Sequence, residues 1–174
     1  LIEYVNGEKA LPENPIMITF DDGFESFYTL AYPLLKQYNF KAVVSVIGSV
    51  TEKYSQIDDH NINYSNLNWS EIAELQKSGL VEFQNHSFDM HKSDNVNRKG
   101  LSKIKSETAD EYKAALTYDL NKLQTLFKDN CGFAPTAVVY PYGAYSDNTL
   151  DIVKSCGFKC TMLCEERINK ITVG

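Results

Sequence analysis

The feature that most constrains this chain is a short apolar run, residues 16–20, that ends at two carboxylates and a glycine, Asp21-Asp22-Gly23. A run of apolar and β-branched residues is typical of a buried strand, and the polar residues after it mark the strand's carboxyl end. Neighbouring side chains on an extended segment point in different directions, so Asp21 and Asp22 can carry out different tasks, such as metal binding and proton transfer. Taken alone, the stretch is better explained as an ordinary Asp-Asp-Gly turn.

Two later stretches repeat this arrangement. Residues 81–84, Val-Glu-Phe-Gln, lead into Asn85-His86-Ser87-Phe88-Asp89-Met90-His91, and the apolar residues 137–139 lead into Tyr140-Pro141-Tyr142-Gly143. In α/β proteins the chemistry lies at the rim where strands end. Two imidazoles and one carboxylate can bind a divalent ion such as zinc and leave coordination positions open for water and substrate. The three strand ends therefore predict a metal centre at the rim of a sheet.

The three motifs, in this order from about Pro15 to Phe158, resemble those of the polysaccharide deacetylases of carbohydrate esterase family four. The resemblance implies metal-dependent hydrolysis of N-acetyl groups from a polysaccharide that contains N-acetylglucosamine, with release of acetate. It implies a divalent metal, zinc first among the candidates, bound by Asp22, His86 and His91. By the same resemblance, the catalytic residues are Asp21 as general base and the backbone N–H of Tyr142 as oxyanion donor, and the substrate-binding residues are Pro141, Tyr142 and Tyr145.

The chain departs from the family pattern in three ways. Its two histidines are five residues apart rather than four, and Val139 stands where many members have an arginine that orients the catalytic aspartate. These two departures together, the wider histidine spacing and the missing arginine before Tyr-Pro-Tyr-Gly, resemble the branch that deacetylates poly-β-1,6-N-acetylglucosamine. The family's late histidine, which protonates the leaving amine, has no counterpart after His91. We expect either a missing carboxyl-terminal segment or a substitute acid, for which His60 is the remaining imidazole.

Strands that alternate with helices predict a parallel α/β sheet or barrel. The resemblance implies a distorted (β/α) barrel, incomplete at the carboxyl end because the chain supplies only five or six strands. A long polar loop at 48–66 is expected to form one lip of the active site. The expected strands are 16–20, 41–47, 81–84, 136–140, 159–164 and, as a sixth, 170–173; the expected helices are 27–38, 69–78, 107–128 and 147–156, with a loop at 92–106.

Length and charge limit the classes of partner. With 174 residues and 43% hydrophobic content, we expect a single domain over 1–174, truncated at one or both ends. The net charge of −6 argues against nucleic acid and anionic membranes as partners. No stretch is long and apolar enough to cross a bilayer, and no signal-peptide pattern opens the chain. We expect a monomer that acts outside the cell or at its surface, because that is where the implied substrate lies.

The four cysteines carry no predicted function. Cys160 and Cys164 are interpreted as small core thiols on one face of a strand, and a disulfide between Cys131 and Cys156 is the alternative for an exported protein. None of the spacings matches a common zinc knuckle.

Two other functions stay open beside the deacetylase hypothesis. The first is a non-catalytic glycan-binding module that keeps the fold and the metal site. The second, a phosphatase, is disfavoured because the aspartate pair lacks Asp-x-Asp-x-Thr/Val spacing. The rings of Phe24, Phe88 and Tyr145 are equally consistent with core packing and with sugar stacking.

Overall fold

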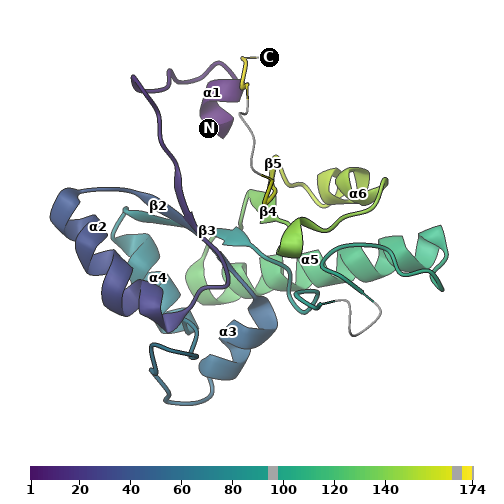
Figure 1. Ribbon diagram of the computed structural model, residues 1–174, viewed down its shortest axis with the longest axis horizontal. Helices are drawn as coiled ribbons and strands as arrows, with labels where there is room; N and C mark the ends of the chain where they lie inside the picture. The colour runs from purple at the N-terminus through teal and green to yellow at the C-terminus, as the bar shows by residue number, and fades with distance from the viewer. Residues whose placement is uncertain (94–97, 166–169, 174) are drawn as a thin grey trace.

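Five parallel strands form one curled sheet in the computed structural model, which describes residues 1–93, 98–165 and 170–173 (Figure 1). The strands are hydrogen-bonded in the order in which they occur in the chain. This order is how a (β/α) barrel winds, whereas a doubly wound sheet reverses direction at a switch point. The described strands form a half-barrel, as expected for an incomplete barrel; they are β1 (Ile18–Phe20), β2 (Ala42–Val46), β3 (Val81–Asn85), β4 (Ala137–Val139) and β5 (Cys160–Met162).

The register of the strands brings their carboxyl ends to one rim. Phe20 of β1 pairs with Val44 of β2, and Val46 of β2 pairs with Asn85 of β3. Asn85 also pairs with Val138 of β4. The residues that follow β1, β3 and β4 therefore come out beside one another, which is what the sequence predicted from the three strand ends.

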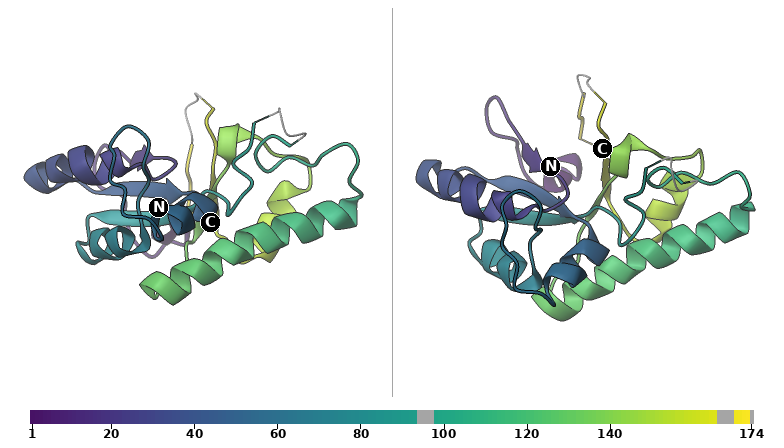
Figure 2. Two further views of the ribbon diagram at one scale, coloured as in Figure 1. Left: turned by 90° about the horizontal axis from the view of Figure 1, so that it is seen from below. Right: turned by 60° about the horizontal axis from the view of Figure 1, so that its bottom comes forward.

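The helices are supported by local capping and by apolar contacts. Capping boxes open the α4 and α5 helices, with Asn68 and Glu71 at the first and Thr108 and Glu111 at the second. Helix α5 is long and runs beside the sheet in both views of Figure 2. The elements are α1 (Ile2–Val5), the π-helical turn η1 (Phe27–Ala31), α2 (Tyr32–Tyr38), α3 (Gly48–Tyr54), α4 (Trp69–Lys77), α5 (Ala109–Cys131), the 3₁₀ turn η3 (Pro141–Gly143) and α6 (Thr149–Ser155).

Two clusters of buried side chains form the core, and α5 belongs to both. Leu123 and Phe127 pack with β2, β3 and α4 in the first cluster. One to three turns earlier, Tyr112, Leu116 and Leu120 pack with β4 and α6 in the second. Helix α5 therefore connects the two halves of the sheet, and its middle passes behind the rim that carries the histidines.

Several sequence predictions are wrong. Residues 48–54 form the helix α3, so the expected loop is shorter, and residues 170–173 carry no strand. All four cysteines are free, which excludes the Cys131–Cys156 disulfide, and Cys164 is exposed rather than a core thiol. Of the expected loop at 92–106, residues 94–97 lie outside the described residues, as does the chain end at 174.

Candidate metal centre

Asp22 is the first of three side chains that meet at the rim. Its backbone has φ of 69°, a left-handed conformation that aspartate tolerates better than most residues. Gly23 follows with φ of 68°, and a Cβ added there would lie 2.8 Å from Cγ1 of Val46. Glycine is therefore required at 23, because the turn passes directly against β2. The side-chain amide of Asn66 donates a hydrogen bond to the carbonyl of Asp22 at 2.8 Å and holds the turn from the other side.

His86 follows directly after β3 and is almost completely buried, with 2% of its surface exposed. Its Nδ1 lies 2.8 Å from the backbone carbonyl of Val139. A carbonyl can only accept, so Nδ1 carries the hydrogen and Nε2 keeps its lone pair. That lone pair faces Asp22, whose Oδ1 lies 3.4 Å from Nε2. Fixing one ring nitrogen by a backbone carbonyl is how proteins orient histidines that bind metals.

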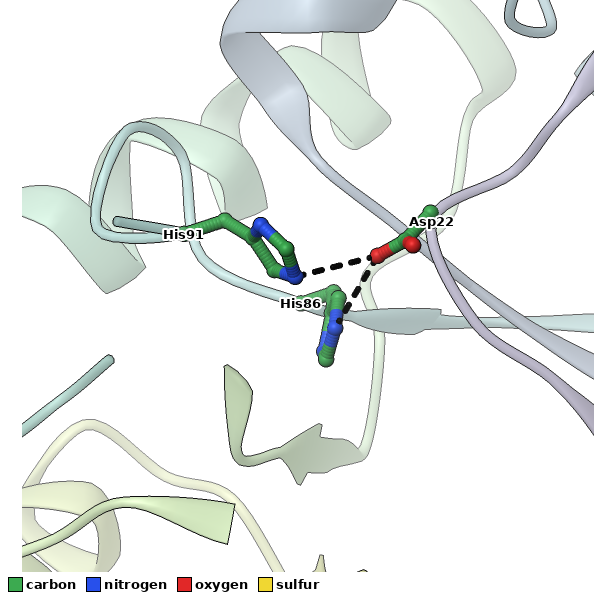
Figure 3. A group of neighbouring side chains, drawn as sticks. All are labelled: Asp22, His86 and His91. Carbon is green, nitrogen blue, oxygen red and sulfur yellow. Dashed lines mark ion pairs between the residues drawn. The ribbon is translucent and has the colours of Figure 1, made fainter. Parts of the chain in front are cut away.

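His91 reaches the same carboxylate from the loop after β3 (Figure 3). Its Nε2 lies 3.2 Å from Oδ1 of Asp22. The loop is held in place by Asp119 of α5, whose two carboxylate oxygens accept the backbone N–H groups of Phe88 and Asp89, both at 2.8 Å. Ser87 begins this loop with φ of 71°, an unusual conformation for a serine.

The three side chains fit a divalent cation. Oδ1 of Asp22 is buried without a hydrogen-bond partner, although two imidazole nitrogens lie close to it. Ligand atoms on a tetrahedral zinc lie about 3.3 to 3.6 Å from one another, close to the 3.2 and 3.4 Å observed between Asp22 and the two imidazoles.

Asp21 points away from this cluster, as its alternation with Asp22 predicted. It lines a groove on the inner side of the sheet, together with Thr19 and Val139. The hydroxyl of Ser45 donates a hydrogen bond to Oδ1 of Asp21 at 2.6 Å. The family's arginine is absent here, and Ser45 provides the contact that holds this carboxylate.

The Tyr-Pro-Tyr-Gly turn lies against His91. The ring of Tyr142 is tilted over that imidazole, with 4.6 Å between centroids, and its hydroxyl lies 3.4 Å from Nδ1. Tyr142 has φ of 58° inside η3 and, like Tyr145, is about half exposed. Pro141 is buried and therefore shapes the turn rather than presenting a surface. Of the other rings weighed as sugar platforms, Phe24 is exposed and Phe88 packs against the core.

The segment that contains Gly100 packs directly against the Tyr-Pro-Tyr-Gly turn. A Cβ added to Gly100, whose φ is 50°, would overlap the carbonyl oxygen of Pro141. The N–H of the next residue, Leu101, donates to the carbonyl of Ala144 at 3.1 Å. Sequence reasoning did not identify Gly100, Asp119, Asn66 or Ser45, because each acts on a residue far away in the chain.

His60 does not join the three residues at the rim. Its Nδ1 lies 3.4 Å from Glu25 and 3.1 Å from Glu71, and its Nε2 lies 3.3 Å from Asp58. The loop that carries it does reach the site, but through Asn66. We therefore do not assign His60 the role of acid for the leaving amine.

Comparison with known proteins agrees with this geometry. A family model described as polysaccharide deacetylase matches residues 8–161. Poly-beta-1,6-N-acetyl-D-glucosamine N-deacetylase of Staphylococcus aureus (strain MRSA252) is 32% identical over 165 residues, which are 94% of this chain and 52% of that protein. The chain thus spans about half the length of this relative.

Two solved structures have a similar fold. The BpsB deacetylase domain from Bordetella bronchiseptica superposes with a TM-score of 0.86 at 27% identity, covering 99% of this chain and 72% of that one. The de-N-acetylase from Aggregatibacter actinomycetemcomitans has a TM-score of 0.83 at 28% identity, covering 98% of this chain and 71% of that one.

Proposed function

This chain belongs to the polysaccharide deacetylase family, and on that premise we propose that it hydrolyses N-acetyl groups of an N-acetylglucosamine polymer and releases acetate. The observation that carries the proposal is the convergence of Asp22, His86 and His91 at the rim, with a second carboxylate, Asp21, adjacent in the chain. A metal-binding set beside a second carboxylate is one arrangement that can hydrolyse an unactivated amide, because the metal activates water and the carboxylate takes up a proton.

We propose that Asp22, His86 and His91 hold the divalent metal, zinc first among the candidates because its preferred ligands are imidazole and carboxylate. When bound, such an ion supplies Lewis-acid activation of water and of the acetyl carbonyl. The buried Oδ1 of Asp22 and the oriented Nε2 of His86 support this assignment, since both present lone pairs to the same point.

Asp21 takes up the proton of the attacking water in this proposal. Its Oδ1 already accepts the hydroxyl of Ser45, which leaves Oδ2 for the proton. The backbone N–H of Tyr142 donates to the oxyanion that develops on the acetyl carbonyl. This N–H lies in the first turn of η3, where N–H groups have no partner within the helix.

Exposed rings beside the rim support a polysaccharide substrate. Tyr142 and Tyr145 are 45% and 49% exposed and lie on the turn next to His91. Aromatic faces of this kind pack against the apolar faces of sugar rings. The name of the Staphylococcus aureus relative suggests poly-β-1,6-N-acetylglucosamine as the polymer.

Such a polymer is found outside the cell, so we propose that the protein acts there or at the cell surface. No helix in the described part of the chain is long and apolar enough to cross a membrane.

The direct test is release of acetate from a β-1,6-linked N-acetylglucosamine oligomer by the purified chain. We expect acetate release that a chelator abolishes and added zinc restores. Asp21→Asn should abolish release, whereas Asp151→Asn, at an exposed carboxylate of α6, should not.

A second measurement separates catalysis from binding alone. If the oligomer binds to the metal-loaded chain but no acetate appears, the protein is a glycan-binding module and the deacetylase proposal is wrong. Acetate release that persists in the Asp21→Asn variant would overturn the proposed role of that carboxylate.

A further inference from the structure

A second group of metal-binding side chains lies away from the rim. Glu25 comes from the turn after β1, His60 from the loop after α3, and Glu71 from the first turn of α4. One atom from each lies within 4.8 Å of the others. Three separate segments of the chain thus converge on one point.

The two carboxylates of this group are buried. The side chain of Glu25 is 4% exposed and that of Glu71 is 10% exposed. Oε2 of Glu25 is buried without a hydrogen-bond partner, while its Oε1 faces His60. A buried carboxylate with an unpaired oxygen costs free energy unless a cation compensates it. Glu71 adds a second buried carboxylate, whose Oε2 accepts the N–H of Asn68. A neutral imidazole supplies no positive charge to compensate the two.

His60 is oriented as a metal ligand. Its Nδ1 lies 3.1 Å from Oε1 of Glu71 and 3.4 Å from Oε1 of Glu25. These separations are close to the 3.2 and 3.4 Å between Asp22 and its two histidines, and to the spacing of ligands on tetrahedral zinc. The other nitrogen, Nε2, lies 3.3 Å from Oδ1 of Asp58. A carboxylate behind the second nitrogen is the usual support of a metal-bound histidine.

We propose that Glu25, His60 and Glu71 form a second divalent-cation site, suited to zinc. Two carboxylates and one imidazole favour zinc and its neighbours over calcium or magnesium, which prefer oxygen ligands alone. His60 is half exposed and lines a surface pocket with Asp58 and Asn68, so the imidazole is open to solvent.

A cation at this site would tie the loop before α4 to the turn that carries Asp22. The N–H of Glu25 donates to the carbonyl of Ser65, and the N–H of Leu67 donates to the carbonyl of Gly23, both at 2.8 Å. Asn66, between them, donates to the carbonyl of Asp22. The second site therefore has a structural role, separate from the chemistry proposed at the rim.

The experiment counts zinc in four forms of the chain after removal of free metal by dialysis. We expect two zinc ions per wild-type chain, one in His91→Ala, one in His60→Ala and none in the double variant. The His91→Ala chain should also melt at a higher temperature with zinc than without it, and calcium should have no such effect. Glu71→Gln, which keeps the helix cap, should remove the second ion, whereas Glu74→Gln on the same helix should retain it.

Removing the carboxylate of Asp58, which lies next to Nε2 of His60, should weaken zinc binding without abolishing it. Asp58→Asn should weaken zinc binding at this site by about tenfold, the low end for such partners because Asp58 is exposed. Equal zinc content in wild type and His60→Ala would overturn the proposal. The proposal would also be overturned if His60→Ala lowered the melting temperature while added zinc left it unchanged. Protonated His60, rather than a metal ion, would then compensate the two carboxylates. Neither result depends on deacetylase activity.

Discussion

The backbone carbonyl of Val139 accepts a hydrogen bond from Nδ1 of His86 at 2.8 Å. This bond connects the ends of β3 and β4 and determines which imidazole nitrogen faces Asp22. The contact uses the backbone of Val139, so it does not depend on the side chain at this position. On the neighbouring strand β2, the hydroxyl of Ser45 donates a hydrogen bond to Asp21, the proposed general base.

The two adjacent carboxylates should separate by function. Asp21→Asn should retain the rim metal and lose turnover by about a hundredfold or more, because a general base contributes that much. Asp22→Asn should lose both, because it removes a proposed ligand. Zinc content and acetate release are measured in a His60→Ala background, which leaves only the rim site. Equal metal retention in the two variants would mean that the roles are assigned wrongly.

Ser45→Ala should lower the rate of acetate release by about ten- to a hundredfold while zinc content stays the same. The hydroxyl holds Asp21, and a hydrogen bond to a charged group contributes about 1.5 to 3 kcal/mol. The check is a double-mutant cycle: in an Asp21→Asn background, Ser45→Ala should cause little further loss. A full additional loss in that background would show that Ser45 acts on something else.

Gly100→Ala should displace the Tyr142 turn and reduce acetate release without removing zinc. A methyl group there overlaps the carbonyl oxygen of Pro141. The control is Gly79→Ala, which has a similar positive φ of 71° but nothing within 4 Å of the added carbon. Both variants should lose about 1 to 2 kcal/mol of stability from the left-handed backbone, but only Gly100→Ala should lose turnover. Equal turnover in the two variants would contradict the close contact between Gly100 and the carbonyl of Pro141.

The buried carboxylate of Asp119 should make stability depend on pH. Burial raises its pKa to about 6, above the ordinary value of about 4. The folded state thus favours the protonated form of Asp119. The contribution of Asp119 to the free energy of unfolding is therefore most favourable below pH of about 4 and is lost as pH rises to about 6. The loss is on the order of 3 kcal/mol.

Urea unfolding of the metal-free chain between pH 4 and 7.5 measures this effect. The stability of wild type relative to Asp119→Asn should fall as pH rises from 4 to 6 and stay constant above it. The charged neighbours Asp89 and Lys92 are the same in both. Asp129→Asn, at an exposed carboxylate of the same helix, is the control. If the free energy of unfolding differs between wild type and Asp119→Asn by the same amount at every pH, Asp119 does not titrate in this range and the prediction is wrong.

Where local chemistry decides the structure, the sequence predicted it well. Asn68 and Glu71 are three residues apart, and their capping box begins α4 at Trp69, where the expected helix 69–78 begins. Helix α3 was missed because its support is not local. It has no side-chain cap, and the N–H groups of Gly48 and Ser49 donate to the carbonyls of Ser87 and Phe88. The opposite error occurred at Ile171 and Val173, whose apolar side chains predicted a strand and which are exposed.

By itself, the sequence determined that strands alternate with helices and that Asp22, His86 and His91 follow strands that end at one rim. This was accessible because parallel strands in register bring their carboxyl ends together, whatever the sequence between them. Only the tertiary structure decided which groups hold these residues and what His60 does. Ser45 on Asp21, Asp119 behind the histidine loop, and His60 between Glu25 and Glu71 are contacts across long sequence separations. Such pairs leave no periodicity or spacing in the chain, because their geometry arises only when packing closes the loops between them.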